Sequence, residues 1–138
     1  MKYAVDMLDY HIRNDSCLIV KPSAIVDEVF NKFRQNTRLK REACGILIGG
    51  FKRAKNTIVI DKCTSPGAQD VRRRSSYTMK DSKHQLEVTK EFKTSNGFSN
   101  YLGIWHTHPE PNPIPSRIDL NDWEKVMLLN REILPAFL

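Results

Sequence analysis

The sequence Ala43-Cys44-Gly45-Ile46-Leu47-Ile48-Gly49-Gly50 is apolar throughout and ends on two glycines. A short apolar run that is closed by a turn signal is typical of a buried β-strand. A second run, Thr57-Ile58-Val59-Ile60, follows shortly afterwards and is rich in β-branched side chains, which strands favour. We therefore expect the two runs to pair as a hairpin at the heart of the fold.

Regular structure is predicted on both sides of this hairpin. Residues 18–20 form a strand-like run, and Pro22 and Ser23 follow as helix-start signals. The helix is expected to end at residues 36–37, with one apolar face formed by Ile25, Val26, Val29, Phe30 and Phe33. Beyond a polar loop, the sequence predicts a short strand over 77–79, a helix from Asp81 to about Lys93, and a strand over 101–105.

The C-terminal part begins with a proline-rich stretch, residues 109–115, which rejects regular structure. Ser116 then caps a helix that is expected to run to about Asn130. Residues 133–138 read as the approach to another strand, so we expect a domain truncated at its C-terminal end, unless Leu138 is the natural end. We interpret residues 1–138 as one α/β domain.

The composition is that of an ordinary globular domain, with 40% hydrophobic and 28% charged residues in a chain of 138. The sequence has neither the roughly 18 consecutive apolar residues of a membrane span nor a signal-peptide stretch. Cys17, Cys44 and Cys63 are odd in number and widely spaced, which fits reduced thiols of a cytoplasmic protein. Cys44 lies inside an apolar run, so we expect it to pack rather than to react.

The net charge of +6 is moderate, and its densest basic run is Arg72-Arg73-Arg74. Such a run could contact nucleic acid, an anionic lipid surface or an acidic protein, but a solvated loop is the favoured interpretation. Nucleic acid is not an expected partner, because aromatic and basic residues are not interleaved. His11 and His84 have no partners in sequence and are expected at the surface.

A candidate metal site starts at His106 and His108. Residues at i and i+2 of an extended segment project to the same side, so both imidazoles can reach one ion at about 2.0–2.1 Å. Asp119 follows after ten residues, and the stiff proline-rich loop gives the chain room to return. These three ligands and a water would complete an open tetrahedral zinc site of the catalytic kind.

Two further residues complete the candidate site. Glu42, directly before the buried strand, could act as the base that moves the proton of the water. Ser116 could hydrogen-bond a developing oxyanion. Each residue also has a structural interpretation: Ser116 and Asp119 form a capping-box pattern, the two histidines could be surface residues at a strand end, and Glu42 could be a solvated acid.

The complete pattern resembles the signature of the JAMM (MPN-type) zinc metallopeptidases. That signature is a glutamate, then H-[ST]-H-P, then S-x-x-D, with ten residues between the second histidine and the aspartate. Glu42, the sequence His106-Thr107-His108-Pro109 and the sequence Ser116-Arg117-Ile118-Asp119 meet each position. The resemblance covers roughly residues 17–138 and includes the residues that flank Glu42 and His106.

The resemblance implies a curved mixed sheet flanked by helices, close to the fold of cytidine deaminases, whose own P-C-x-x-C zinc motif is absent here. It implies one Zn²⁺ held by His106, His108 and Asp119, with Glu42 as proton carrier and Ser116 at the oxyanion. It also implies hydrolysis of the amide bond after the C-terminus of a ubiquitin-like modifier. Small bacterial members of the family accompany activating and conjugating enzymes in conjugation and antiphage-defence systems.

Three other functions remain open on the sequence. A zinc-free MPN scaffold would only bind partners, but such relatives usually lack one or more ligands. A peptidase of the same class could act on a sulfur-carrier protein or a cell-wall peptide. DNA-associated relatives such as the RadC-like proteins carry H-N-H-P instead of His106-Thr107-His108-Pro109.

Overall fold

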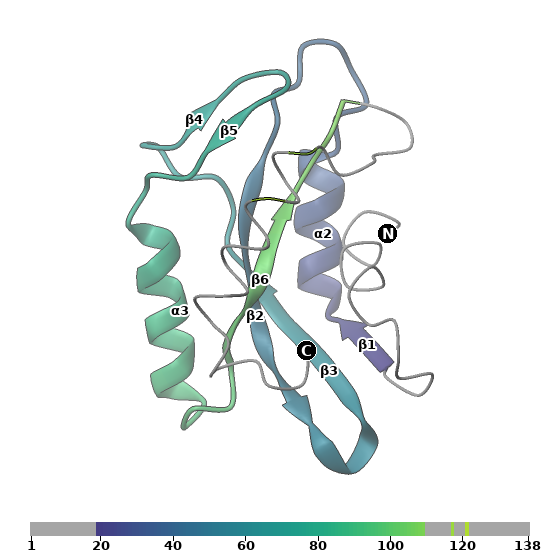
Figure 1. The fold of residues 1–138 in the computed structure, drawn as a ribbon, viewed down its shortest axis with the longest axis vertical. Coiled ribbons are helices and arrows are strands. Elements are labelled where there is room, and N and C mark those ends of the chain that lie inside the picture. The colour runs from purple at the N-terminus through teal and green to yellow at the C-terminus, as the bar shows by residue number, and fades with distance from the viewer. Residues whose placement is uncertain (1–18, 110–116, 118–120, 122–138) are drawn as a thin grey trace.

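The computed structural model describes residues 19–109, 117 and 121 and shows a mixed four-stranded sheet accompanied by two helices (Figure 1). The strand order in the sheet is β1-β3-β2-β6, and β4 and β5 form a separate two-stranded ribbon. In chain order the elements are β1 (Ile19–Pro22), α2 (Ala24–Phe33), β2 (Cys44–Lys52), the short 3₁₀ helix η1 (Arg53–Lys55), β3 (Thr57–Cys63), β4 (Val71–Arg72), β5 (Tyr77–Thr78), α3 (Lys83–Thr94) and β6 (Asn100–His106).

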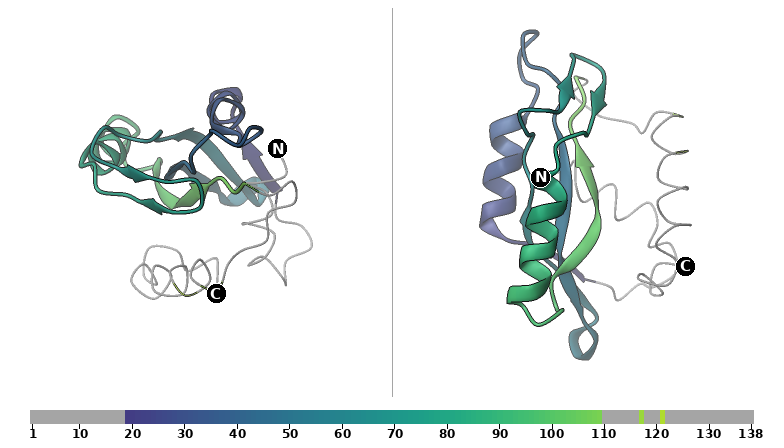
Figure 2. Two further views of the ribbon diagram at one scale, coloured as in Figure 1. Left: turned by 90° about the horizontal axis from the view of Figure 1, so that it is seen from above. Right: turned by 90° about the vertical axis from the view of Figure 1, so that its left-hand side faces the viewer.

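The strand β2 occupies a central place in the sheet. It pairs antiparallel with β3 on one side and with β6 on the other, whereas β1 runs parallel to β3. The helix α2 lies against one face of the sheet, and α3 lies beside β2 and β6 (Figure 2). The α/β class and the helix-flanked mixed sheet expected from the sequence are thus confirmed, as is the predicted hairpin.

The core explains why residues 43–50 are apolar throughout. Leu47 packs in a cluster with Val26 of α2 and with Trp105, while Ile46 and Ile48 pack against Val88 of α3. Because successive side chains of a strand point to opposite faces, β2 buries both of its faces. A strand in this position needs a continuous apolar run rather than an alternating one.

Gly45 allows β2 and its neighbours to approach closely. A Cβ atom at this position would overlap the backbone oxygen of Thr64 and lie 2.5 Å from Trp105 Nε1. The same indole nitrogen donates a hydrogen bond of 2.9 Å to that Thr64 oxygen. The contact fixes Trp105, the residue that precedes His106, against the end of β3.

Most element boundaries differ from the expected ones by one to three residues. The helix α2 ends at Phe33, before the expected stop at 36–37, and β3 continues to Cys63. The ribbon strand β4 lies where a loop was expected, and its partner β5 stops at Thr78. Of the helix expected from Ser116, the structure describes only Arg117 and Asn121, which are both helical, while residues 133–138, Cys17 and His11 lie outside the described residues.

The two described cysteines, Cys44 and Cys63, are both buried, which agrees with the expectation that Cys44 packs. Burial, together with the nearby charge of Glu87, raises the pKa of Cys63 to about 12, so its thiolate form is disfavoured at neutral pH. Within the part of the chain that the structure describes, no helix has the length and apolar character needed to cross a membrane.

The expectation that His84 lies at the surface is wrong. Its side chain is 2% exposed and bridges the carboxylate of Asp70, at 2.7 Å, and the hydroxyl of Thr64, at 2.5 Å. An ionised Asp70 only accepts hydrogen bonds, so the imidazole donates from Nε2 and a neutral ring accepts the Thr64 proton at Nδ1. These partners lie 14 and 20 residues away along the chain, which is why sequence proximity did not reveal them.

Asp70 organises the polar segment between β3 and α3. Its buried carboxylate accepts hydrogen bonds from the backbone N–H groups of Gly67, Lys80 and Asp81, from the Tyr77 hydroxyl and from the His84 ring. Burial alone would raise the pKa of this carboxyl, but the hydrogen bonds outweigh burial and hold the pKa well below its usual range.

We expect Asp70→Asn to lower the free energy of unfolding by about 2 kcal/mol, because an amide N–H₂ would face groups that are themselves donors. Urea denaturation followed by circular dichroism measures the change. The matched control is Glu28→Gln on α2, where the carboxyl is exposed and an effect within about 0.5 kcal/mol is expected. Equal stability of Asp70→Asn and the native protein would refute the structural role.

The contribution of Asp70 should also depend on pH. Its folded-state pKa is lowered, so its stabilisation is complete above the unfolded-state pKa of about 4 and is lost as the pH falls through the folded-state pKa. The stability difference between the native protein and Asp70→Asn should therefore be constant from about pH 5 to 7 and narrow below about pH 4. A difference that widens on acidification would contradict this assignment.

Candidate metal centre

The pairing of β2 with β6 brings Glu42 to the two histidines. Cys44 lies opposite His106 in the register, and the pairing continues one step further through Thr107. The Thr107 N–H donates to the Ala43 oxygen at 2.9 Å, and the Ala43 N–H donates to Thr107 Oγ1 at 2.9 Å. One more step places Glu42 opposite His108, although 65 residues separate them in the sequence.

The two imidazoles converge as the alternation of an extended segment requires. Their Nε2 atoms lie 2.7 Å apart, and the ring planes are inclined at 51°. At this distance one neutral ring can donate a proton to the other, or both can direct lone pairs to one cation. Two nitrogens of a tetrahedral zinc site would be about 3.3 Å apart, so a small opening of the pair would accommodate the ion.

Glu42 lies beside this pair with little access to solvent. Its Oε1 atom is 4.0 Å from His108 Nδ1, and the exposed fractions of the Glu42 and His108 side chains are 9% and 15%. This position disagrees with the alternative that Glu42 is one more solvated acid, and the convergence of the rings disagrees with unrelated surface histidines. The arrangement suits a carboxylate that exchanges protons with a molecule held at the histidines.

The described residues supply two of the three expected ligands. Asp119 and Ser116 lie outside the described residues, so their placement stays a prediction. Among the side chains that the structure describes, no group of three or more His, Cys, Asp and Glu residues is suited to a metal ion. The donor set nevertheless fits zinc, because two imidazole nitrogens that converge next to a carboxylate are typical of an open catalytic site.

The β4–β5 ribbon holds the backbone of Glu42 from outside the sheet (Figure 1). The Glu42 N–H donates to the Arg73 oxygen at 2.7 Å, and Arg72 Nε donates to the Glu42 oxygen at 2.9 Å. Arg72 also donates to the Arg41 oxygen at 3.2 Å, and its guanidinium stacks 5.3 Å from the centre of the Phe33 ring. Both backbone groups of Glu42 are therefore satisfied by the ribbon.

The sequence interpretation missed this role of Arg72. The interpretation as a solvated loop agrees with the exposed side chains of Arg73 and Arg74. The Arg72 side chain, in contrast, is half-buried and donates a hydrogen bond to the Glu42 oxygen. The contact links residues 30 positions apart, and no local signal distinguishes Arg72 from the two arginines that follow it.

Comparison with known proteins gives the family. The model of prokaryotic homologs of the JAB domain matches residues 26–136. A CD-NTase/cGAS isopeptidase from Escherichia coli is 44% identical over 67% of this chain, and one from Vibrio cholerae is 35% identical over 86%. The aligned regions cover 58% and 74% of those relatives, so the chain spans less than two thirds of the Escherichia coli protein.

Two further relatives are more distant. A probable metalloprotease from Sinorhizobium fredii is 32% identical over 49% of this chain and 41% of its own length. A solution structure of a protein from Desulfitobacterium hafniense superposes with a TM-score of 0.53 at 23% identity, covering 75% of this chain and 66% of that one. The latter supports the fold alone. The chain belongs to the family of prokaryotic homologs of the JAB domain, and the relatives above are named as CD-NTase/cGAS isopeptidases and a probable metalloprotease.

Proposed function

We propose that this chain is a zinc-dependent isopeptidase that cleaves the amide bond after the C-terminus of a ubiquitin-like modifier. The observation that carries the proposal is the convergence of His106 and His108 next to the buried carboxylate of Glu42. The names of the Escherichia coli and Vibrio cholerae relatives support the choice of an isopeptide bond. Conjugates of a CD-NTase, the class in those names, are the first substrates to test.

The setting that we propose is a bacterial conjugation or antiphage-defence system in the cytoplasm, where the buried thiol of Cys63 stays reduced. Activating and conjugating enzymes would form the bond that this chain cleaves. An intact H-x-H pair next to Glu42 argues against the zinc-free scaffold, because a scaffold needs neither the converging rings nor the carboxylate. The proposal involves neither a membrane nor nucleic acid.

The ligands that we assign to the ion are His106, His108 and Asp119. When bound, zinc supplies Lewis-acid chemistry, which polarises the scissile carbonyl and makes a water molecule more acidic. The four prolines of the sequence from 109 to 115 are expected to limit the positions from which Asp119 can approach. The two hydrogen bonds between Ala43 and Thr107, one of them to the Thr107 hydroxyl, fix the extended conformation that sends both histidines to one side.

Glu42 moves the proton in the proposed reaction. Its carboxylate takes a proton from the attacking water while the carbon–nitrogen bond of the substrate still holds, and it then donates that proton to the leaving amine as the bond breaks. The low exposure of Glu42 favours this exchange, because bulk water competes little for the carboxylate. The Ser116 hydroxyl donates a hydrogen bond to the negative charge that develops on the carbonyl oxygen.

Zinc content tests the ligand assignment. Elemental mass spectrometry should find close to one zinc per native chain and little in His108→Ala, because one of three protein ligands is lost. Glu42→Gln is the matched control, since it changes a neighbouring residue that is not a ligand and should retain zinc. Zinc absent from folded native protein purified without chelators would support the scaffold instead.

Turnover tests the role of Glu42. We expect Glu42→Gln to lower kcat by about 10²–10⁴-fold, because an amide cannot carry the proton. The measurement is the cleavage of a CD-NTase conjugate, resolved by gel electrophoresis. Full activity of a zinc-loaded Glu42→Gln protein would remove Glu42 from the mechanism.

Arg72 should affect the same step through the position of Glu42. We expect Arg72→Ala to lower kcat by about tenfold or more with KM and zinc content nearly unchanged, because a small displacement of a reacting group is costly. Arg53→Ala, in the distant turn between β2 and β3, is the matched loss of one charge and should keep native kcat. An unchanged kcat in Arg72→Ala would show that the hydrogen bond from Arg72 to the Glu42 backbone is unnecessary for the reaction.

A further inference from the structure

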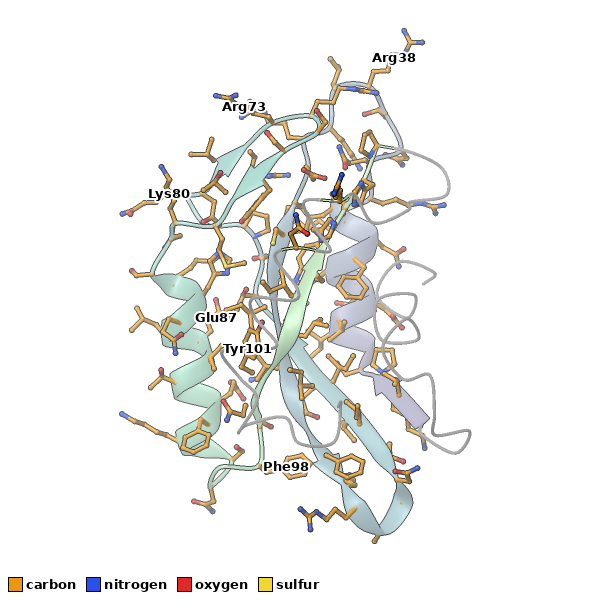
Figure 3. All side chains as sticks on the ribbon, viewed as in Figure 1. Arg38, Arg73, Lys80, Glu87, Phe98 and Tyr101 are labelled. Atoms are coloured by element: carbon orange, nitrogen blue, oxygen red, sulfur yellow. The ribbon has the colours of Figure 1, made fainter. Side chains whose placement is uncertain are left out.

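Two segments that meet at Glu42 carry many cations and no acid. Residues 29–41 and 71–80 contain eight lysines and arginines apart from Arg72, and their sequences include neither aspartate nor glutamate. Hydrogen bonds join the segments, since Arg74 donates to the Arg38 oxygen at 2.6 Å and Gln35 to the Arg74 oxygen at 2.9 Å. Arg38 and Arg73 accordingly lie at the same end of the molecule in Figure 3.

We call the exposed residues Arg38, Arg41, Arg73 and Arg74 the basic edge. Their positive charges are not neutralised by acids of their own segments, so the potential at this end of the molecule attracts anions. A surface that served solubility alone would benefit more from mixed charges. The clustering of positive charges beside Glu42 therefore indicates a binding partner that carries negative charge.

The backbone that carries the basic edge is held in place. The oxygens of Arg38, Lys40 and Arg41 each accept a hydrogen bond, from Arg74, Gln35 and Arg72 respectively. The loop thus keeps a defined shape although it contains no regular structure between α2 and β2. A preorganised surface loses less conformational entropy on binding than a floppy loop does.

The tip of this surface favours a protein over a nucleic acid. Leu39, between Arg38 and Lys40, is 93% exposed, and an apolar tip among cations suits a partner that mixes acidic and apolar side chains. The rings of Phe30, Phe33 and Tyr77 in the same segments are half-buried. They do not offer the stacking platforms by which proteins hold single-stranded nucleic acids.

We propose that the basic edge, with Leu39 at its tip, binds an acidic segment of the protein substrate next to the scissile bond. Arg41 directly precedes Glu42, and the Arg73 oxygen bonds the Glu42 N–H, so a chain that reaches Glu42 passes beside these arginines. The assignment of the segment to the substrate rests on the proposed function. The affinity of the surface for acidic chains does not.

The test uses the full chain and a fluorescent peptide that contains many glutamates and a few leucines. Arg38, Arg41 and Arg73 are replaced together by glutamate, because their hydrogen bonds to Arg74, Arg72 and Glu42 are accepted by backbone oxygens, which the changes leave in place. The matched control replaces Lys52, Arg53 and Lys55 by glutamate at the exposed end of β2 and in η1, at the opposite end of the molecule (Figure 1). Circular dichroism verifies that both variants fold.

Fluorescence anisotropy should show that the native protein and the control variant bind the peptide, more weakly as salt is added. The triple Arg→Glu variant should bind at least about tenfold more weakly, and in cleavage assays it should raise KM with little change in kcat. The native protein could also bind the peptide but cleave no conjugate. If the triple Arg→Glu variant alone then lost peptide binding, the result would support the basic edge as a binding surface and contradict the proposed function.

Three outcomes would overturn the inference. The peptide could bind equally to the two triple variants, or a peptide with glutamine in place of every glutamate could bind as tightly as the acidic one. A DNA duplex could also bind more tightly than the acidic peptide and be released by the Arg→Glu changes, which would identify a nucleic-acid surface instead.

Discussion

The antiparallel pairing of β2 with β6, prolonged by the two hydrogen bonds between Ala43 and Thr107, is the constraint on which the rest of the structure depends. It sets Glu42 opposite His108, and the alternation of an extended chain then sends His106 to the same side. Gly45 and Trp105 help to fix this register. The Trp105 indole donates a hydrogen bond to the Thr64 oxygen, and this close approach leaves no room for a Cβ atom at Gly45. The chemistry therefore rests on strand pairing between segments that are far apart in sequence.

Around this pairing, buried polar groups fix the neighbouring segments through hydrogen bonds. The carboxylate of Asp70 collects donors from the segment between β3 and α3, and His84 connects it to Thr64, the residue whose oxygen receives the Trp105 bond. On the outer side, Arg72 and the Arg73 oxygen hold the backbone of Glu42. The same hydrogen bonds that position Glu42 also arrange the exposed arginines beside it, so the carboxylate proposed to move the proton and a cationic surface share one scaffold.

Apart from β4, the strands and the two helices α2 and α3 of the described region could be predicted from the sequence because their signals are local. The apolar run at 43–50 by itself indicates a strand that is buried on both faces. The H-x-H spacing by itself indicates two side chains that project to the same side of an extended segment. The burial of His84 and the hydrogen bond from Arg72 to the Glu42 backbone could not be predicted, because each depends on partners 14 to 30 residues away. The approach of Glu42 to His108 was expected from the place of Glu42 before the buried strand and from the family pattern, since no periodicity connects residues 66 positions apart.

The central claim is that His106 and His108 hold one zinc ion next to Glu42. X-ray absorption at the zinc edge of the metal-loaded protein tests it most directly, because imidazole rings give characteristic multiple scattering. We predict only nitrogen and oxygen neighbours at about 2.0–2.1 Å, two of them imidazoles, and no sulfur. A sulfur neighbour at about 2.3 Å would assign the metal to a cysteine site and would contradict binding by the two histidines.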